Sequence, residues 1–183
     1  MSQVIPICPI DCSPSLPTFQ FSDCAPETNA AQIRKIYMFH PDHPLVDWTN
    51  PTEWATRISN SSTAATAIRE ITVIGSKPKP EATEKKISGS RIQKGKKNHS
   101  LLLKVDETNQ VNYEHIIREL ECGGDKNIIY ATENYLYGGN DGITVSIGFD
   151  DVIDEDETAL EIFDGDAKWS SKFHPERTRN IIA

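Results

Sequence analysis

Apolar and polar residues alternate along several short segments of this 183-residue chain, a pattern typical of strands that bury one face. The alternation is strictest at Ile143, Val145, Ile147 and Phe149, just after the turn-forming sequence GGNDG. Further β-prone segments, bounded by turn residues, predict strands at 32–41, 68–75, 98–105, 126–133, 135–137 and 158–173.

Helical periodicity is clear between residues 106 and 124. Apolar residues recur there at the i, i+3, i+4, i+7 spacing of an amphipathic helix, at Tyr113, Ile116, Ile117 and Leu120. Three residues can cap its start (Asp106, Thr108 or Asn109), and two glycines can end it (Gly123 and Gly124). A shorter helix is predicted at 50–59, where Asn50 is a suitable N-cap and Glu53 completes a capping box.

Many strands with one long helix between two of them predict a mainly β, α+β domain, a small sandwich or barrel flanked by that helix. Residues 1–31 contain five prolines and little apolar pattern, so we expect an extended N-terminal arm ordered by packing in an assembly. The predicted domain spans 32–173, and a C-terminal arm is expected at 174–183. The apolar content of 37% and the mean hydropathy of −0.47 fit such a loop-rich β domain.

The N-terminus carries no basic residue before Arg34, and the chain has no apolar run long enough to span a bilayer. We therefore expect neither a secretory signal nor a membrane partner, and synthesis in the cytoplasm. In that compartment the four cysteines are expected to be free thiols rather than disulfides: Cys8, Cys12, Cys24 and Cys122.

Charge is segregated along a chain whose formal net charge is −8. Residues 77–104 contain nine Lys or Arg and two acidic residues, whereas residues 141–166 contain ten Asp or Glu and no Lys or Arg. Patches of opposite sign suit pairing within the chain or contact between identical subunits.

The basic segment does not match a phosphate-binding loop. Gly89 and Gly95 are separated by five residues where that motif needs four, and a strand rather than a helix is expected to follow. Nucleic-acid binding is disfavoured by the absence of interleaved aromatic residues and by the low pI of about 5.1. A charged β-hairpin or loop facing solvent or a neighbouring subunit is the preferred interpretation.

No signature of an enzyme or a cofactor site emerges from the sequence. There is no G-x-S-x-G motif, and Cys122 at the end of a helix suggests a small packed residue. Cys8, Cys12, His40 and His43 lack the spacing of a zinc site, and the acidic segment at 150–158 lacks the central glycine of a calcium loop. We therefore expect no catalytic residues, no cofactor and no metal.

The order of elements resembles the tail-tube proteins of long-tailed bacteriophages, a family that shares its fold with the type VI secretion tube protein. The resemblance lies in LLLKV, NQVNYEHIIRELECGG, NIIYATE, GITVSIGFDDV and ALEIFDGDAKWSS, within residues 68–173. The phrases YGGNDGI and KFHPER are also similar to those of virion proteins from phages of gut bacteria. The long proline- and cysteine-bearing N-terminal segment departs from the simplest tail-tube proteins.

The resemblance implies a virion protein with no enzymatic role, whose subunits form stacked hexameric rings around a channel for passing DNA. It also implies that the loop between the early strands reaches the next ring. The residues expected to make this subunit contact are Lys85, Lys86, Arg91, Lys94, Lys96 and Lys97. An acidic set would either line the lumen or pair with that loop: Asp150, Asp151, Asp154, Glu155, Asp156 and Glu157. The alternative is an auxiliary or decoration protein of the phage head, contacting other virion proteins.

Overall fold

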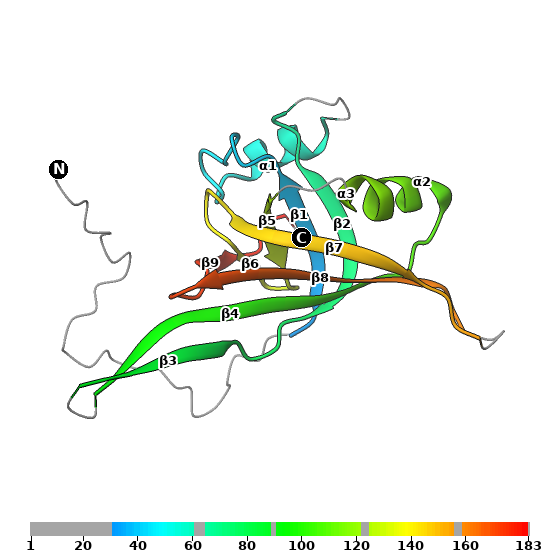
Figure 1. Ribbon diagram of the computed structural model, residues 1–183. Helices are drawn as coiled ribbons and strands as arrows, with labels where there is room; N and C mark the ends of the chain where they lie inside the picture. Colours follow the sequence, from blue (N-terminus) through cyan, green and yellow to red (C-terminus); the bar gives the residue numbers. More distant parts are fainter. Residues whose placement is uncertain (1–30, 61–64, 89–90, 122–124, 156–158, 183) are drawn as a thin grey trace, which may run out of the picture.

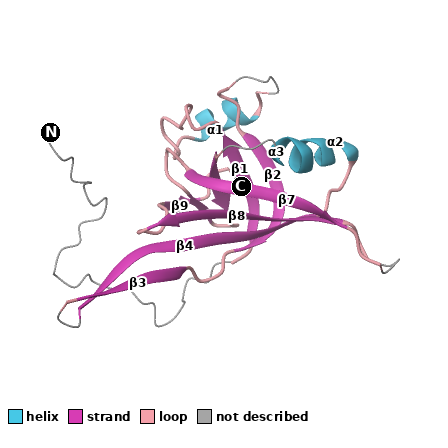
Figure 2. Ribbon diagram, viewed as in Figure 1, coloured by secondary structure: helices cyan, strands magenta, loops and turns pink. Residues whose placement is uncertain are grey.

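The computed structural model describes residues 31–60, 65–88, 91–121, 125–155 and 159–182, with the backbone alone for 91–94. It confirms a mainly β, α+β fold (Figures 1 and 2). The strands are β1 (Ile33–Phe39), β2 (Arg69–Ser76), β3 (Glu81–Ile87), β4 (Arg91–Val105), β5 (Lys126–Ala131), β6 (Tyr135–Tyr137), β7 (Ile143–Val152), β8 (Ile162–Ser171) and β9 (Arg177–Arg179). The helices are α1 (Pro51–Ile58), α2 (Gln110–Asn112), the π-helical turn η1 (Tyr113–Arg118) and α3 (Glu119–Glu121). The last three follow one another directly, and we call residues 110–121 the covering helix.

Six strands close into a barrel in which every neighbouring pair is antiparallel. The ring runs β1–β2–β4–β8–β7–β5 and returns to β1 through pairs such as Ile36 with Tyr130. β5 pairs with β7 along its first half and with β6 along its second half, and β9 then extends the sheet from β6. A closed barrel leaves no unpaired edge on its own strands.

The barrel interior is the main hydrophobic core. Leu101, Leu103 and Val105 of β4 are buried, whereas the alternate residues Leu102 and Lys104 point outward and are exposed. These inward-pointing residues form one core with the inward-pointing apolar residues of the other barrel strands. Ile116 and Ile117 of the covering helix belong to the same core. Tyr113 packs against Phe163, with ring centroids 6.2 Å apart, so the covering helix lies at the Val105–Phe163 end of the barrel.

The predicted apolar stripe of this helix is confirmed. Ile116 and Ile117 are buried, and Tyr113 and Leu120 are partly buried against the same core. Of the three candidate caps it is Asn109 that acts, because its side chain accepts a hydrogen bond from the Asn112 N–H at 3.0 Å.

A second core lies outside the barrel, between β1, β5 and α1. Tyr37 contacts Trp54 edge to face at 5.0 Å, and the Trp54 indole donates a hydrogen bond to the Trp48 carbonyl. Asn50 caps α1 as expected, but Glu53 does not complete a capping box. Its carboxylate accepts hydrogen bonds from the Val46 and Asp47 amides and so fastens the preceding loop instead.

The two predicted arms have different outcomes. Residues 1–30 lie outside the described part of the chain. The C-terminal segment packs on its own domain: β9 pairs with β6, and Ile181 and Ile182 contact the second core. This packing explains why so short a segment with few apolar residues holds a defined position.

Candidate assembly surface and barrel mouth

Of the two forms expected for the basic segment, a β-hairpin or a loop, the structure has the β-hairpin. β3 pairs with the first part of β4, through Ala82 with Lys97 and Ile87 with Arg91. The hairpin leaves the barrel and extends well beyond it (Figure 1). Every side chain of β3 is exposed, so the hairpin has no buried face of its own.

The predicted contact residues are all on this hairpin. Lys85 and Lys86 lie exposed on β3, and Lys96 lies exposed on β4, whereas Lys97 is half-buried. Arg91 and Lys94 take their places on β4 by backbone pairing with Ile87 and Glu84.

The predicted acidic residues that the structure describes lie on β7 or just after it, in a second hairpin formed by β7 and β8. Asp150 pairs directly with Asp164 across the two strands, on the outer face of the barrel. Lys104 of β4 pairs with Asp164 from its other side, whereas Asp150 faces a like charge across the strands, so a further cation beside Asp150 would be favourable. Asp151 is half-buried, and one of its carboxylate oxygens is buried without a hydrogen-bond partner among the described residues.

Asp154 and Glu155 follow the end of β7 and are exposed, while Asp156 and Glu157 lie outside the described residues. Three large apolar side chains share this hairpin with the carboxylates: Val152 is 42% exposed, Ile153 80% and Leu160 85%. Grouped apolar side chains with a polar rim are typical of a protein contact rather than of a simple solvated surface.

The two charged hairpins are at opposite ends of the molecule. In the pairing of β4 with β8, Val105 lies beside Phe163 at the acidic end and Lys97 lies beside Ser171 at the other end. β4 then continues past Lys97 to the basic tip, and its 15 residues span on the order of 45 Å. Among the residues that the structure describes, the predicted basic and acidic sets are therefore not brought together within one chain.

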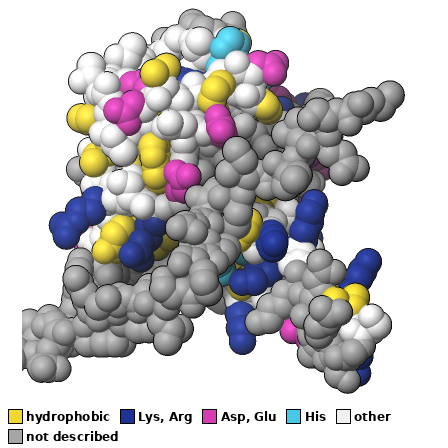
Figure 3. Space-filling model, turned by 90° about the vertical axis from the view of Figure 1, so that its left-hand side faces the viewer, with side chains coloured by type: hydrophobic (Ala, Val, Ile, Leu, Met, Phe, Trp, Pro, Cys, Tyr) yellow, Lys and Arg dark blue, Asp and Glu magenta, His cyan; other side chains and the backbone are white. Residues whose placement is uncertain are grey.

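Surface charge follows the same division. On the face that carries the basic hairpin, Lys and Arg side chains gather in the lower part, and Asp and Glu lie mostly above them (Figure 3). One face of the molecule thus presents its positive charge as a group.

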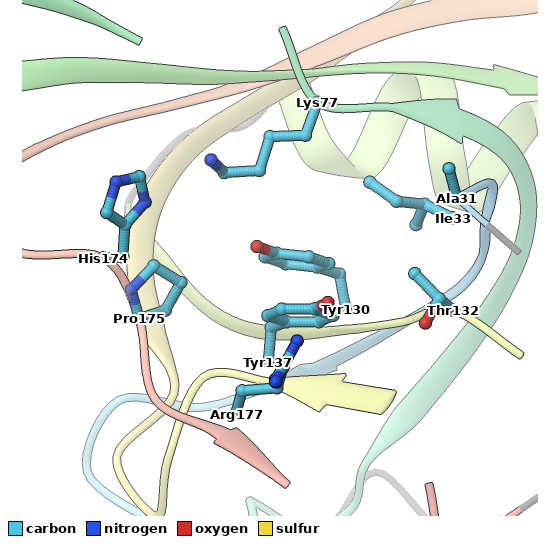
Figure 4. A pocket seen from close by; sticks show the side chains of 9 residues that line it. All are labelled: Ala31, Ile33, Lys77, Tyr130, Thr132, Tyr137, His174, Pro175 and Arg177. Carbon is cyan, nitrogen blue, oxygen red and sulfur yellow. The ribbon is translucent and has the colours of Figure 1, made fainter. Parts of the chain in front are cut away.

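At the end of the barrel away from the covering helix, the described residues surround a cavity of about 420 Å³, which we call the barrel mouth. Its lining comes from the ends of β1, β2 and β5, from β6, and from the segment that follows β8 (Figure 4). The lining residues are Ala31, Ile33, Lys77, Tyr130, Thr132, Tyr137, His174, Pro175 and Arg177. None of these is acidic.

Aromatic rings form one wall of the barrel mouth. Tyr130 and Tyr137 stack with centroids 4.8 Å apart and planes 8° from parallel, and the Arg177 guanidinium lies over the Tyr135 ring at 4.2 Å. Burial, and to a lesser extent the neighbouring Tyr137, raises the pKa of the Tyr130 hydroxyl well above its usual range, so it stays protonated and can donate.

His99 lies just behind the barrel mouth and is 2% exposed. Its ring stacks on Trp169 at 4.9 Å and meets the His174 ring edge to face at 5.4 Å. Neither ring nitrogen makes a well-formed hydrogen bond with a described residue, although the Ser171 backbone is close enough to favour the charged form slightly.

Burial and nearby positive charges disfavour the charged forms of the basic groups in and beside the barrel mouth. Burial and then the Lys97 ammonium hold the pKa of Lys77 below its usual value. Burial, together with the charges of Lys77 and Lys97, also lowers the pKa of His99 and of His174. The sequence did not point to this cluster, because its members come from separate elements that only the strand register brings together.

A metal centre finds no support in the described ranges, where no group of three or more His, Cys, Asp or Glu side chains is placed to hold an ion. His40 and His43 do lie together, with ring centroids 5.8 Å apart, but Cys8 and Cys12 are outside the described residues. Among the helices that can be described, none is long and apolar enough to cross a membrane.

No family model, curated protein or solved structure matches this chain. The functional argument therefore depends on the geometry of the molecule itself.

Proposed function

We propose that this protein is a self-assembling structural subunit of a bacteriophage particle, and specifically the tail-tube subunit, forming stacked rings around a DNA channel. The observation that carries the proposal is the placement of the basic β3–β4 hairpin and the acidic β7–β8 hairpin at opposite ends of one pair of strands. Because the two patches cannot meet within a chain, each is available to the complementary patch of another copy.

This arrangement suits contacts between unlike ends. A two-fold contact between antiparallel copies would pair both ends at once and stop at a dimer, whereas a head-to-tail contact leaves a free basic end and a free acidic end at every step. Such contacts generate rings when the rotation closes and open filaments when it does not. Rings and stacked rings are the assemblies of a tube.

Apolar side chains strengthen the same contact. Ile153 and Leu160 are exposed on the acidic hairpin, and Ile87 is 45% exposed near the tip of the basic one. Charge pairs alone in water contribute little, so burial of these side chains would supply much of the affinity. Their presence beside the carboxylates favours pairing of the acidic hairpin with a protein over lining of the DNA channel.

Unpaired strand edges offer a second means of association. Within the described residues, β3 has a strand neighbour on one side, β4, and β9 has one on one side, β6. An open edge presents unpaired N–H and C=O groups to a strand of the next subunit.

The assignment to the tail tube is more specific than the proposal of a self-assembling subunit of a phage particle. It rests on the resemblance in element order, supported by a closed barrel with one covering helix and by a long hairpin after the second strand. A decoration protein of the phage head is the alternative, and it would bind a capsid lattice without forming tubes.

A charge-swap experiment tests the assembly contact. Lys85, Lys86 and Lys96 are replaced by Glu in one variant, and Asp150, Asp154 and Glu155 by Lys in another. We expect each variant alone to sediment as a smaller species than the native protein, because both of its ends carry the same sign. An equimolar mixture should restore assembly, because unlike ends then meet again.

The control variant carries Arg34, Lys172 and Arg179 changed to Glu, which lowers the net charge by the same amount as the basic-hairpin variant but leaves both charged hairpins intact. It should assemble like the native protein. Native-like assembly of the basic-hairpin variant, or failure of the mixture to assemble, would contradict the proposed contact.

A further inference from the structure

The barrel mouth combines an open, concave cavity with positive charge that no described acidic group neutralises. Its volume of about 420 Å³ lies in the range of small-molecule sites. Glu176 stands between two lining residues in the sequence, yet its carboxylate lies over Gly139 instead.

Three donors converge within this cavity. In Figure 4 the Lys77 ammonium, the His174 ring and the Tyr130 hydroxyl point toward the same part of the space, while the stacked faces of Tyr130 and Tyr137 form its floor. The His99 ring contacts the His174 ring from behind the lining of the cavity. His99 is only 2% exposed, and neither of its ring nitrogens makes a well-formed hydrogen bond with a described residue. Buried polar groups without partners are uncommon and are expected to acquire a partner or a charge nearby.

We propose that the barrel mouth is a binding site for a small aromatic phosphate, with the phosphate between Lys77, His174 and Tyr130 and the ring against the tyrosine floor. Burial, and then the charges of Lys77 and Lys97, disfavour the cationic forms of the groups around this cavity, and a bound phosphate would offset both effects. Charge-assisted hydrogen bonds to phosphate oxygens are stronger than neutral ones, and stacking on a tyrosine favours a planar ligand.

This inference is independent of self-assembly, because none of the residues changed in the charge-swap variants lines the cavity. The barrel mouth and the tips of the charged hairpins are separate surfaces. Failure of one proposal therefore leaves the other in place.

Isothermal titration calorimetry with phenyl phosphate tests the site on the full chain. The native protein should bind it saturably with one site per chain, and Lys77→Met should weaken binding by about tenfold or more. Lys79→Met is the matched control, because Lys79 is exposed two residues away and does not line the cavity. It should bind like the native chain.

Two further ligands distinguish the contribution of the phosphate group from that of the ligand's aromatic ring. Inorganic phosphate should bind more weakly than phenyl phosphate, and neutral phenol should not bind measurably. No saturable binding of phenyl phosphate, or equal weakening by both lysine variants, would overturn the proposal. Inorganic phosphate binding as tightly as phenyl phosphate would overturn the role of the tyrosine floor.

Discussion

The His99 ring lies flat against Trp169, with centroids 4.9 Å apart and planes 6° from parallel. The two residues face each other across β4 and β8, where backbone pairing places them side by side. Burial in this position favours the neutral imidazole, and together with the nearby Lys77 it lowers the pKa of His99 from its usual 6.5.

This lowered pKa makes stability depend on pH. Below pH 6.5 the unfolded chain binds a proton at His99 while the folded chain does not, so the free energy of unfolding falls as pH drops below that value. His174, whose pKa is also lowered, acts in the same direction. Urea unfolding at several pH values between about 5 and 7 measures the slope.

His99→Phe keeps an aromatic ring against Trp169 but cannot titrate, so the slope should decrease in this variant. His115→Phe is the control, because that side chain is exposed on the covering helix. An unchanged slope in His99→Phe would show that His99 titrates alike in the folded and unfolded chains.

Barrel closure depends on a glycine opposite an aromatic ring. Gly165 on β8 pairs with Phe149 on β7, and a Cβ at Gly165 would overlap the Phe149 ring. We expect Gly165→Val to lower the free energy of unfolding by about 1–3 kcal/mol or more, as overpacking does in other cores.

Gly148→Val is the matched control, since Gly148 directly precedes Phe149 on β7 and a Cβ at Gly148 would meet nothing within 4 Å. Valine suits a strand, so this change should be neutral or slightly stabilising. Equal unfolding midpoints for the two variants would contradict the account of the barrel core.

Arg57 holds the loop before α1 in place. Its guanidinium donates to the carbonyls of His43, Pro44 and Thr66 and lies 3.4 Å from the Glu53 carboxylate, with only 12% of its side chain exposed. Arg57→Ala would leave several acceptors without a partner, and we expect a loss of about 2–4 kcal/mol in urea unfolding.

Arg34→Ala provides the comparison, because Arg34 pairs with Glu133 at a site where both side chains are at least half exposed. That change should cost less than about 1 kcal/mol. Similar losses in the two variants would argue against a structural role for the Arg57 network.

Apolar residues on the acidic hairpin are predicted to contribute to assembly but not to folding. Ile153→Ser and Leu160→Ser together should reduce the sedimenting fraction while leaving the unfolding midpoint unchanged, since both side chains are largely exposed in the single chain. Val46→Ser is the control: Val46 is equally exposed, at 86%, but lies on neither hairpin. Loss of assembly with Val46→Ser as well would indicate a general effect of surface apolarity.

The sequence predicted those elements that bury a face. Alternation identified β7, and helical spacing identified the covering helix, because in each case the core contacts one set of residues. For the β3–β4 segment the sequence left a hairpin and a loop open, since all of β3 is exposed and leaves no apolar pattern to detect. Its strands are held by cross-strand pairing and by contacts such as Thr83 Oγ1 with the Lys96 carbonyl.

Candidate sites were predictable only in part. The charged segments are visible in composition, but their placement at opposite ends follows from the register of β4 with β8. The barrel mouth was not predicted, because Lys77, His99, Tyr130 and His174 are scattered along the chain and no local motif joins them.

Electron microscopy of the purified native protein tests the central claim, self-assembly into a tube, most directly. The proposal predicts rings with six-fold symmetry and a central pore, and stacked tubes at high protein concentration and low salt, where charge pairing is least screened. Dispersed single chains under those conditions would contradict it.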